Sequence, residues 1–178
     1  MINMLKKGFQ KQSIMSTSRS IDEAMVLFNG RSCLKQYMSL KPTKRGYKIW
    51  VHSVARTGYM FDFEIYTDKD QDGSGIGLGG RVVKNLWQSL KHRNLHVTFD
   101  NFFSSYTLLE HLYKDGIYSI LYSTTTVRSN KKDLPVVARH PTLTDRGEMK
   151  WRIKEHTGYV HICPLPVVSY ILNYLLTC

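Results

Sequence analysis

Two aspartates in this sequence, Asp22 and Asp100, are candidates for metal-dependent chemistry. Each belongs to a short apolar segment typical of a buried β-strand. If the two strands were neighbours in one sheet, the carboxylates would converge. Two-metal phosphoryl transfer uses carboxylates to hold two divalent cations about 3.5–4 Å apart, one activating the nucleophile and one stabilising the leaving oxygen. Aspartates at strand ends are also common without any function, so two unrelated surface aspartates are the simpler interpretation of these residues alone.

A glycine-rich stretch resembles a dinucleotide-binding motif. Gly75-Ile76-Gly77-Leu78-Gly79-Gly80 satisfies G-x-G-x-x-G, and Asp100 follows Gly80 by 20 residues. In a nucleotide-binding unit, however, a strand leads almost directly into the first glycine and belongs to a parallel βαβ unit. Here the polar residues 67–74 intervene, and the preceding strand is predicted to form a hairpin. We therefore interpret the stretch as a connecting loop.

An acidic motif lies just before these glycines. Asp68-x-Asp70-x-Asp72-Gly73 matches the start of an EF-hand calcium loop. The twelfth position of such a loop holds a bidentate glutamate, but here it is Gly79, and a predicted strand precedes the motif where a helix is required. A solvated acidic loop is the better interpretation.

Hydrophobic periodicity indicates which elements would position the two aspartates. The predicted order is a strand, a β-hairpin, a helix, a strand, a helix and a strand: 21–28, 46–54 with 59–66, 82–90, 95–100, a helix capped by Ser104 or Ser105 and ending at Asp115, and 117–122. This order is typical of an α/β fold with an RNase H-like mixed sheet, here incomplete on its C-terminal side. In such a sheet the first strand and the strand after the first helix are parallel neighbours, which would bring Asp22 and Asp100 together.

The charge of the chain favours a polyanionic partner. Lys and Arg total 25 against 14 Asp and Glu, so the formal net charge is +11 and the sequence pI is about 9.6. Basic side chains that neutralise phosphates release condensed counterions, which favours nucleic acid, although a solubilising surface is the plainer alternative. The candidate DNA contacts are Lys35, Lys44, Arg45, Lys48, Arg128, Lys131 and Lys132.

Other sequence features argue against a secreted or membrane protein. Three cysteines lie far apart and form no C-x-x-C pair, so neither a disulfide framework nor a zinc site is indicated. The N-terminus lacks the apolar core of a signal peptide. The apolar run 167–176 is shorter than the roughly 20 residues that span a bilayer. An intracellular protein without a membrane partner is expected.

The amino-acid sequence around both aspartates resembles the catalytic domain of piggyBac-type transposases. The resemblance covers roughly residues 5–150 and rests on long ordered strings: Ser20-Ile21-Asp22-Glu23-Ala24-Met25-Val26-Leu27-Phe28-Asn29-Gly30-Arg31-Ser32, Thr57-Gly58-Tyr59, Phe99-Asp100-Asn101-Phe102-Phe103-Ser104-Ser105 and Thr126-Val127-Arg128-Ser129-Asn130-Lys131. It implies an RNase H-like core that performs cut-and-paste DNA transposition in the nucleus with three aspartates and Mg²⁺. Asp22 matches the first catalytic, metal-binding aspartate and Asp100 the second.

The sequence also departs from this family pattern. The family's third aspartate lies past the position where this chain ends, and the resemblance fades after about Arg152. We expect a lead-in segment (1–19), a partial core (20–123) and the start of an insertion with a divergent tail (124–178). The resulting hypothesis is a transposase-derived remnant in which Mg²⁺ binding is weak or lost and whose partner is DNA; whether it also pairs with a related full-length transposase is left open by the sequence. The alternatives are a domesticated nucleic-acid-binding protein without catalysis and an unstable product without function.

Overall fold

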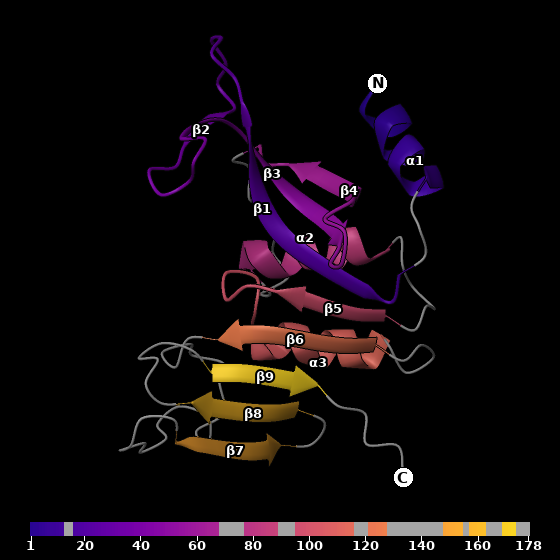
Figure 1. Ribbon diagram of the computed structural model, residues 1–178, viewed down its shortest axis with the longest axis vertical. Helices are drawn as coiled ribbons and strands as arrows, with labels where there is room; N and C mark the ends of the chain where they lie inside the picture. The colour runs from indigo at the N-terminus through magenta and orange to yellow at the C-terminus, as the bar shows by residue number, and fades with distance from the viewer. Residues whose placement is uncertain are drawn as a thin grey trace.

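The computed structural model of the chain contains one mixed β-sheet with two helices, α2 and α3, packed on the same face (Figure 1). It describes residues 1–12, 16–67, 77–88, 95–115, 121–127, 148–154, 157–162 and 169–173. The elements along the chain are α1 (Ile2–Gln12), β1 (Ser18–Leu27), β2 (Lys35–Tyr37), β3 (Arg45–Val54), β4 (Met60–Ile65), α2 (Gly77–Trp87), β5 (Leu95–Phe99), α3 (Tyr106–Asp115), β6 (Leu121–Val127), β7 (Met149–Lys154), β8 (Thr157–Ile162) and β9 (Ser169–Asn173).

The centre of the sheet has the strand order β4-β3-β1-β5-β6. β1 is antiparallel to β3 and parallel to β5, and β5 is parallel to β6. This arrangement confirms the predicted RNase H-like mixed sheet, including the prediction that the first strand and the strand after the first helix are parallel neighbours. Beyond β6, the strands β9, β8 and β7 continue the sheet in antiparallel pairing.

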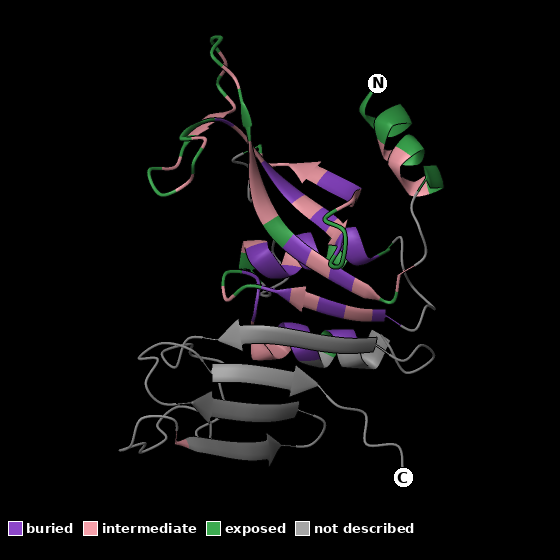
Figure 2. Cartoon of the chain, viewed as in Figure 1, coloured by how far each residue is buried: buried purple, intermediate pink, exposed green. Residues whose placement is uncertain are grey.

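The hydrophobic core lies between the sheet and the two helices that cover it (Figure 2). Its members come from β1, β3, β4, β5, α2, α3 and the turn after β5: Ile21, Trp50, Phe61, Val82, Val83, Leu86, Trp87, Leu95, Val97, Phe99, Phe103, Leu108, Leu109 and Leu112. The helical spacing seen in the sequence is therefore confirmed for both helices within the described residues. The Ser105 hydroxyl accepts a hydrogen bond from the Leu108 amide at 3.0 Å, which makes Ser105 the N-cap of α3.

The predicted β-hairpin is formed by β3 and β4. The backbone amide of Val54 donates to the Tyr59 carbonyl at 2.9 Å, and Gly58 has a φ of +70°, a conformation that favours glycine. The register shifts between His52 and Ser53, so β4 contains a bulge. As a result Phe61 and its two successors are all buried, and the strict alternation expected over 59–66 is interrupted.

Several predicted boundaries were wrong. α2 begins at Gly77, inside the stretch interpreted as a loop, because the small residues of its first turn allow the helix to approach the chain after β5. The last predicted strand, 117–122, overlaps only the start of β6, which runs to Val127, and residues 116–120 lie outside the described part. β1 was predicted as a buried strand, yet Leu27 at its end is 64% exposed, and β1 continues past Ile21, where its pairing with β5 stops.

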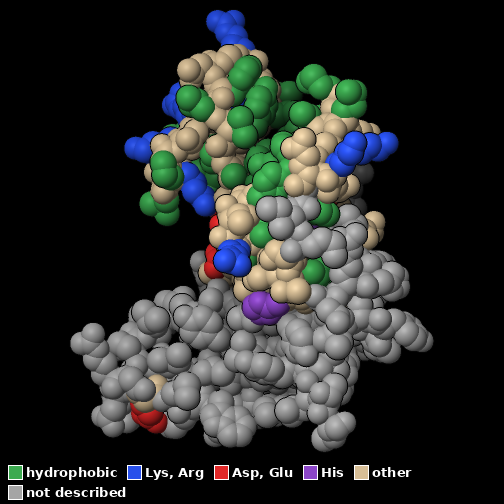
Figure 3. Space-filling view, turned by 45° about the vertical axis from the view of Figure 1, so that its right-hand side comes forward, with side chains coloured by type: hydrophobic (Ala, Val, Ile, Leu, Met, Phe, Trp, Pro, Cys, Tyr) green, Lys and Arg blue, Asp and Glu red, His purple; other side chains and the backbone are tan. Residues whose placement is uncertain are grey.

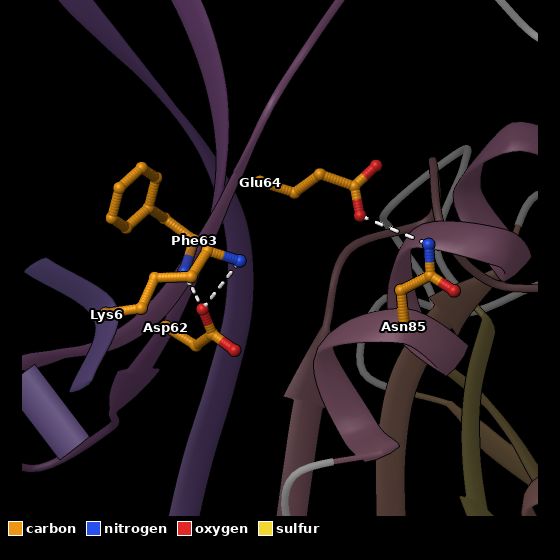
Figure 4. Close-up of polar contacts among 5 residues, drawn as sticks. All are labelled: Lys6, Asp62, Phe63, Glu64 and Asn85. Atoms are coloured by element: carbon orange, nitrogen blue, oxygen red, sulfur yellow. Dashed lines mark hydrogen bonds and ion pairs between the residues drawn. The ribbon is translucent and has the colours of Figure 1, made fainter. Parts of the chain in front are cut away.

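The N-terminal segment, for which the sequence predicted no element, holds a helix that docks on the edge of the sheet. The Lys6 ammonium lies 3.1 Å from Asp62, and the Asp62 carboxylate also accepts the Phe63 amide at 2.7 Å (Figure 4). Two residues further along β4, Glu64 accepts a hydrogen bond from Asn85 of α2 at 3.3 Å. β4 therefore joins α1 to the helix-covered sheet.

The predicted division at 19/20 and 123/124 stays a prediction. Both positions fall inside strands, β1 and β6 respectively. The acidic motif at 68–73 and Gly75 lie outside the described residues. Within the described ranges, no helix is long and apolar enough to cross a membrane.

Candidate active site

The pairing of β1 with β5 places the two predicted aspartates next to each other. The last paired residues of these parallel strands are Ile21 and Phe99, so Asp22 and Asp100 are the first residues beyond the same end of the ladder. Neighbouring strands lie about 4.8 Å apart. Carboxylates at matching positions of two such strands can reach one cation. The structure thus brings together two residues that are 78 positions apart in the sequence.

Both aspartates are exposed, in contrast to the residues that precede them. Ile21 and Phe99 are buried in the core under the helices, whereas Asp22 and Asp100 are open to solvent. Successive side chains of a strand point to opposite faces, so Asp22 lies on the face of β1 away from α2. Oδ1 of Asp22 accepts the Glu23 amide at 2.7 Å, and Oδ1 of Asp100 accepts the Asn101 side-chain amide at 3.1 Å.

The donor set fits part of a site for a hard divalent cation. Carboxylate oxygens are the ligands that Mg²⁺ prefers, and Mg²⁺ is commonly held by one or two carboxylates with water and substrate phosphates completing the shell. The described residues contain no group of three His, Cys, Asp or Glu side chains that could hold a metal ion. The described residues therefore provide two carboxylate side chains, those of Asp22 and Asp100, as candidate ligands for such a cation.

The turn that carries Asp100 is held by aromatic packing. The Phe103 amide donates to the Asp100 carbonyl at 3.1 Å, closing a tight turn after β5. Phe102 stacks on Trp50 of β3 with ring centroids 5.3 Å apart, and Phe103 meets the same indole edge-on at 5.4 Å. Trp50 is fully buried, so the turn is fixed to the core and not only to its own strand.

Glu23, the residue after Asp22, is the centre of an ion-pair cluster that the sequence did not reveal. Its carboxylate lies 3.0 Å from the Lys48 ammonium and 3.2 Å from that of Lys41. Burial acts to raise the pKa of Glu23, but hydrogen bonds and charge from Lys48 and Lys41 outweigh it, so the pKa lies below its ordinary value. Glu23 and Trp50 are directly opposed across β1 and β3, which places this cluster on the helix-covered face.

Lys48 joins this cluster to the turn after Asp100. Its ammonium lies 4.2 Å from the centroid of the Trp50 ring and 5.3 Å from that of Phe102. A third ring, that of Tyr66, lies 5.6 Å away. A cation over aromatic faces is attracted by the ring quadrupoles. In the sequence, Lys48 and Trp50 fall on one face of a predicted strand, but nothing there pairs Lys48 with Glu23.

The candidate DNA contacts lie in different environments. Lys44 and Arg45 are exposed, and the Arg45 guanidinium lies over the Tyr37 ring at 5.5 Å. The Lys35 ammonium donates to the Gly30 carbonyl at 2.9 Å, and Lys48 is engaged as above. Lysine and arginine side chains are spread around the upper part of the molecule in Figure 3 and do not form a single patch on the face shown. Arg128, Lys131 and Lys132 lie outside the described residues, and the DNA contacts stay predictions.

Comparison with known proteins indicates one family. The family model for Transposase IS4 matches residues 1–175. Human PiggyBac transposable element-derived protein 2 is 31% identical over 134 residues, which cover 71% of this chain and 21% of that protein. Human PiggyBac transposable element-derived protein 3 is 30% identical over 160 residues, covering 86% of this chain and 26% of that protein.

A solved structure agrees with the sequence relatives. The cryo-EM structure of a piggyBac transposase synaptic complex with hairpin DNA is similar with a TM-score of 0.84 and 25% identity, covering 97% of this chain and 36% of that one. The chain thus spans about a quarter of the length of the curated relatives and about a third of the solved one. The fold, the family model and the relatives agree with the resemblance found in the sequence, and the chain therefore belongs to the piggyBac family of transposases and transposase-derived proteins.

Proposed function

We propose that this chain carries two of the three metal-binding aspartates of a piggyBac-type centre for DNA strand cleavage and transfer. The observation that supports this most directly is the register of β1 and β5, whose last pair, Ile21 and Phe99, immediately precedes the exposed residues Asp22 and Asp100. Two exposed carboxylates at the end of the β1–β5 pairing supply part of the ligand set that two-metal phosphoryl transfer requires.

In this role, Asp22 and Asp100 bind the cation and fix its position relative to the sheet. A bound Mg²⁺ would supply Lewis acidity, lowering the pKa of the attacking water or 3′-hydroxyl and neutralising charge on the phosphate. The hydrogen bond from the Glu23 amide orients Oδ1 of Asp22. The Asn101 amide does the same for Asp100. Because both side chains are exposed, a DNA backbone can reach the cation without any displacement of the core.

A third carboxylate is needed to complete such a centre, and the described residues do not supply one beside Asp22 and Asp100. Because the resemblance places the family's third aspartate beyond the residues matched here, we propose that residues 1–178 alone do not perform complete strand transfer. Activity would require a further segment carrying the third aspartate, in cis or from a related full-length transposase. The same proposal places the protein in the nucleus, bound to DNA.

Paramagnetic broadening tests the metal-binding part of this proposal. Mn²⁺ titrated into the isotope-labelled 178-residue chain should first broaden the amide resonances of Glu23 and Asn101, which flank the two aspartates. Asp100→Asn should remove this selectivity. Broadening that begins elsewhere, or that is unchanged in the variant, would show that the two aspartates do not form a cation site.

A strand-cleavage assay tests whether the centre is complete. With labelled transposon-end DNA and Mg²⁺ or Mn²⁺, the 178-residue chain should form no DNA hairpin. Robust hairpin formation that Asp22→Asn abolishes would contradict incompleteness and would establish a working centre in this chain.

A second candidate function is nucleic-acid binding without catalysis. The net charge of +11 favours it, together with the exposure of Lys44 and Arg45 at the start of β3. DNA affinity should then fall steeply with salt, and a double change of Lys44 and Arg45 to alanine should make the log–log salt slope shallower by up to about two. Asp22→Asn should leave the affinity in metal-free buffer undiminished. Affinity independent of salt would contradict a phosphate-dominated mode of binding.

A further inference from the structure

The Lys48 side chain contacts residues that lie close to each of the two aspartates. On one side its ammonium pairs with Glu23, the residue after Asp22, at 3.0 Å. On the other it lies 5.3 Å from the ring of Phe102, two residues after Asp100. Asp22 belongs to β1 and Asp100 follows the end of β5. Their separation therefore depends on the contacts that hold these two chain segments together.

The β1–β5 ladder does not itself fix those ends. The last paired residues are Ile21 and Phe99, so the ladder stops one residue before the aspartates. From there β1 continues along β3, while the chain after β5 turns away at residues 101–103. The connection beyond the ladder runs through β3, which pairs with β1 and carries Trp50 and Lys48 under the turn.

The environment of Lys48 is that of a structural contact and not of a mobile surface lysine. Its side chain is only 14% exposed, and its charge faces a carboxylate that is 20% exposed. Glu23 is also paired with Lys41, so the carboxylate is held from two directions. If Lys48 contacted a DNA phosphate instead, its ion pair with Glu23 would break and the aromatic rings beneath its ammonium would be exposed.

We propose that Lys48 is a positioning residue that holds Asp22 and Asp100 at the separation required for a shared divalent cation. It acts by tying Glu23 of β1 to Phe102 of the turn after β5 through its own place on β3. This inference rests on the proposed metal-binding function and extends it to a residue on the opposite face of the sheet. The role differs from the phosphate contact that the sequence predicted for Lys48.

The direction in which one substitution changes the cation affinity distinguishes a positioning role from a simple charge effect. Lys48 is positive, so if only its charge mattered, Lys48→Met would relieve repulsion and tighten cation binding. If Lys48 positions the carboxylates, Lys48→Met loosens binding, by roughly 10-fold or more as for other residues that orient metal ligands. Lys48→Arg should stay within about threefold of wild type, because a guanidinium also pairs with carboxylates and stacks on aromatic rings.

Mn²⁺ affinity, measured by water-proton relaxation on the full 178-residue chain, gives the first readout. Lys84→Met is the matched control, since Lys84 is exposed on α2 and loses the same charge. Weaker binding in Lys48→Met but not in Lys84→Met supports the proposal. Unchanged or tighter binding in Lys48→Met, with Asp22→Asn still weakening it, would overturn the positioning role while leaving the metal site intact.

Amide hydrogen exchange gives a readout that does not depend on metal. The Phe103 amide reports the turn, because it donates to the Asp100 carbonyl at 3.1 Å. The Leu109 amide, which donates to the Ser105 carbonyl at 3.1 Å in α3, reports general stability. In Lys48→Met, exchange of Phe103 should accelerate about tenfold more than that of Leu109, and Lys48→Arg should restore it. Equal acceleration of both amides would show a merely structural loss and would refute the proposal, even if the wild-type chain bound no Mn²⁺.

Discussion

Gly79 in the first turn of α2 controls how closely this helix approaches the turn that carries Asp100. A Cβ added there would lie 2.6 Å from the Phe102 carbonyl oxygen and 2.8 Å from the Phe103 Cα. Both distances are below ordinary van der Waals contact, and both atoms belong to the backbone, so no side-chain rotation can relieve the overlap. Gly79→Ala must therefore move either α2 or the turn after β5.

Two effects of opposite sign decide the size of this perturbation. Replacing glycine by alanine inside a helix stabilises it by up to about 1 kcal/mol, and by less in the first turn. Forcing an extra methyl into a packed interior costs about 1–3 kcal/mol. The steric term is larger, so Gly79→Ala should lower the free energy of unfolding by about 1–2 kcal/mol.

Urea denaturation compares this variant with Gly8→Ala as its matched control. An added Cβ at Gly8 in α1 would meet nothing within 4 Å, so only the helix-propensity term remains and the free energy of unfolding should rise by up to about 1 kcal/mol. The two identical substitutions should thus shift the urea midpoint in opposite directions. A Gly79→Ala chain as stable as wild type would refute the close approach of α2 to the Asp100 turn.

Two further predictions concern capping and pH. Ser105→Ala should lower the free energy of unfolding by about 1 kcal/mol through loss of the α3 cap, and an unchanged urea midpoint would contradict this contribution. His52 is buried, and burial together with the charge of Arg19 lowers its pKa from 6.5 to about 4. Between pH 6.5 and about pH 4, His52 binds a proton in the unfolded chain but not in the folded chain. The contribution of His52 to the free energy of unfolding is therefore fully present above pH 6.5. It falls by about 1.4 kcal/mol per pH unit as the pH drops through this range. His52→Gln should flatten this dependence; an equally steep slope in that variant would assign it to other groups.

The parts of the fold that local patterns specify could be predicted from the sequence. Alternation around Gly58 gave the β3–β4 hairpin, and helical spacing gave the buried faces of α2 and α3. Serine before an apolar repeat predicted a cap at Ser104 or Ser105, and the structure shows that it is Ser105. In each case the signal lies within a few residues, where backbone preference and side-chain periodicity determine structure directly.

The parts that depend on distant contacts could not be predicted. The start of α2 at Gly77 depends on packing against a turn more than 20 residues later, and glycine alone signals a loop as readily as a close approach. β9 lies between β6 and β8, and no short-range pattern in 124–178 indicated that pairing. The pairing of Lys48 with Glu23 became visible only with the register of β1 and β3.

A double-mutant cycle for Mn²⁺ binding tests the central claim, that Asp22 and Asp100 bind one cation together. Affinities of the wild-type chain, Asp22→Asn, Asp100→Asn and the double variant would be measured in the same low-salt buffer. If both carboxylates bind the same cation, the losses are strongly non-additive, and either single change removes nearly as much affinity as both. Additive losses, or affinity that neither change reduces, would contradict a shared site.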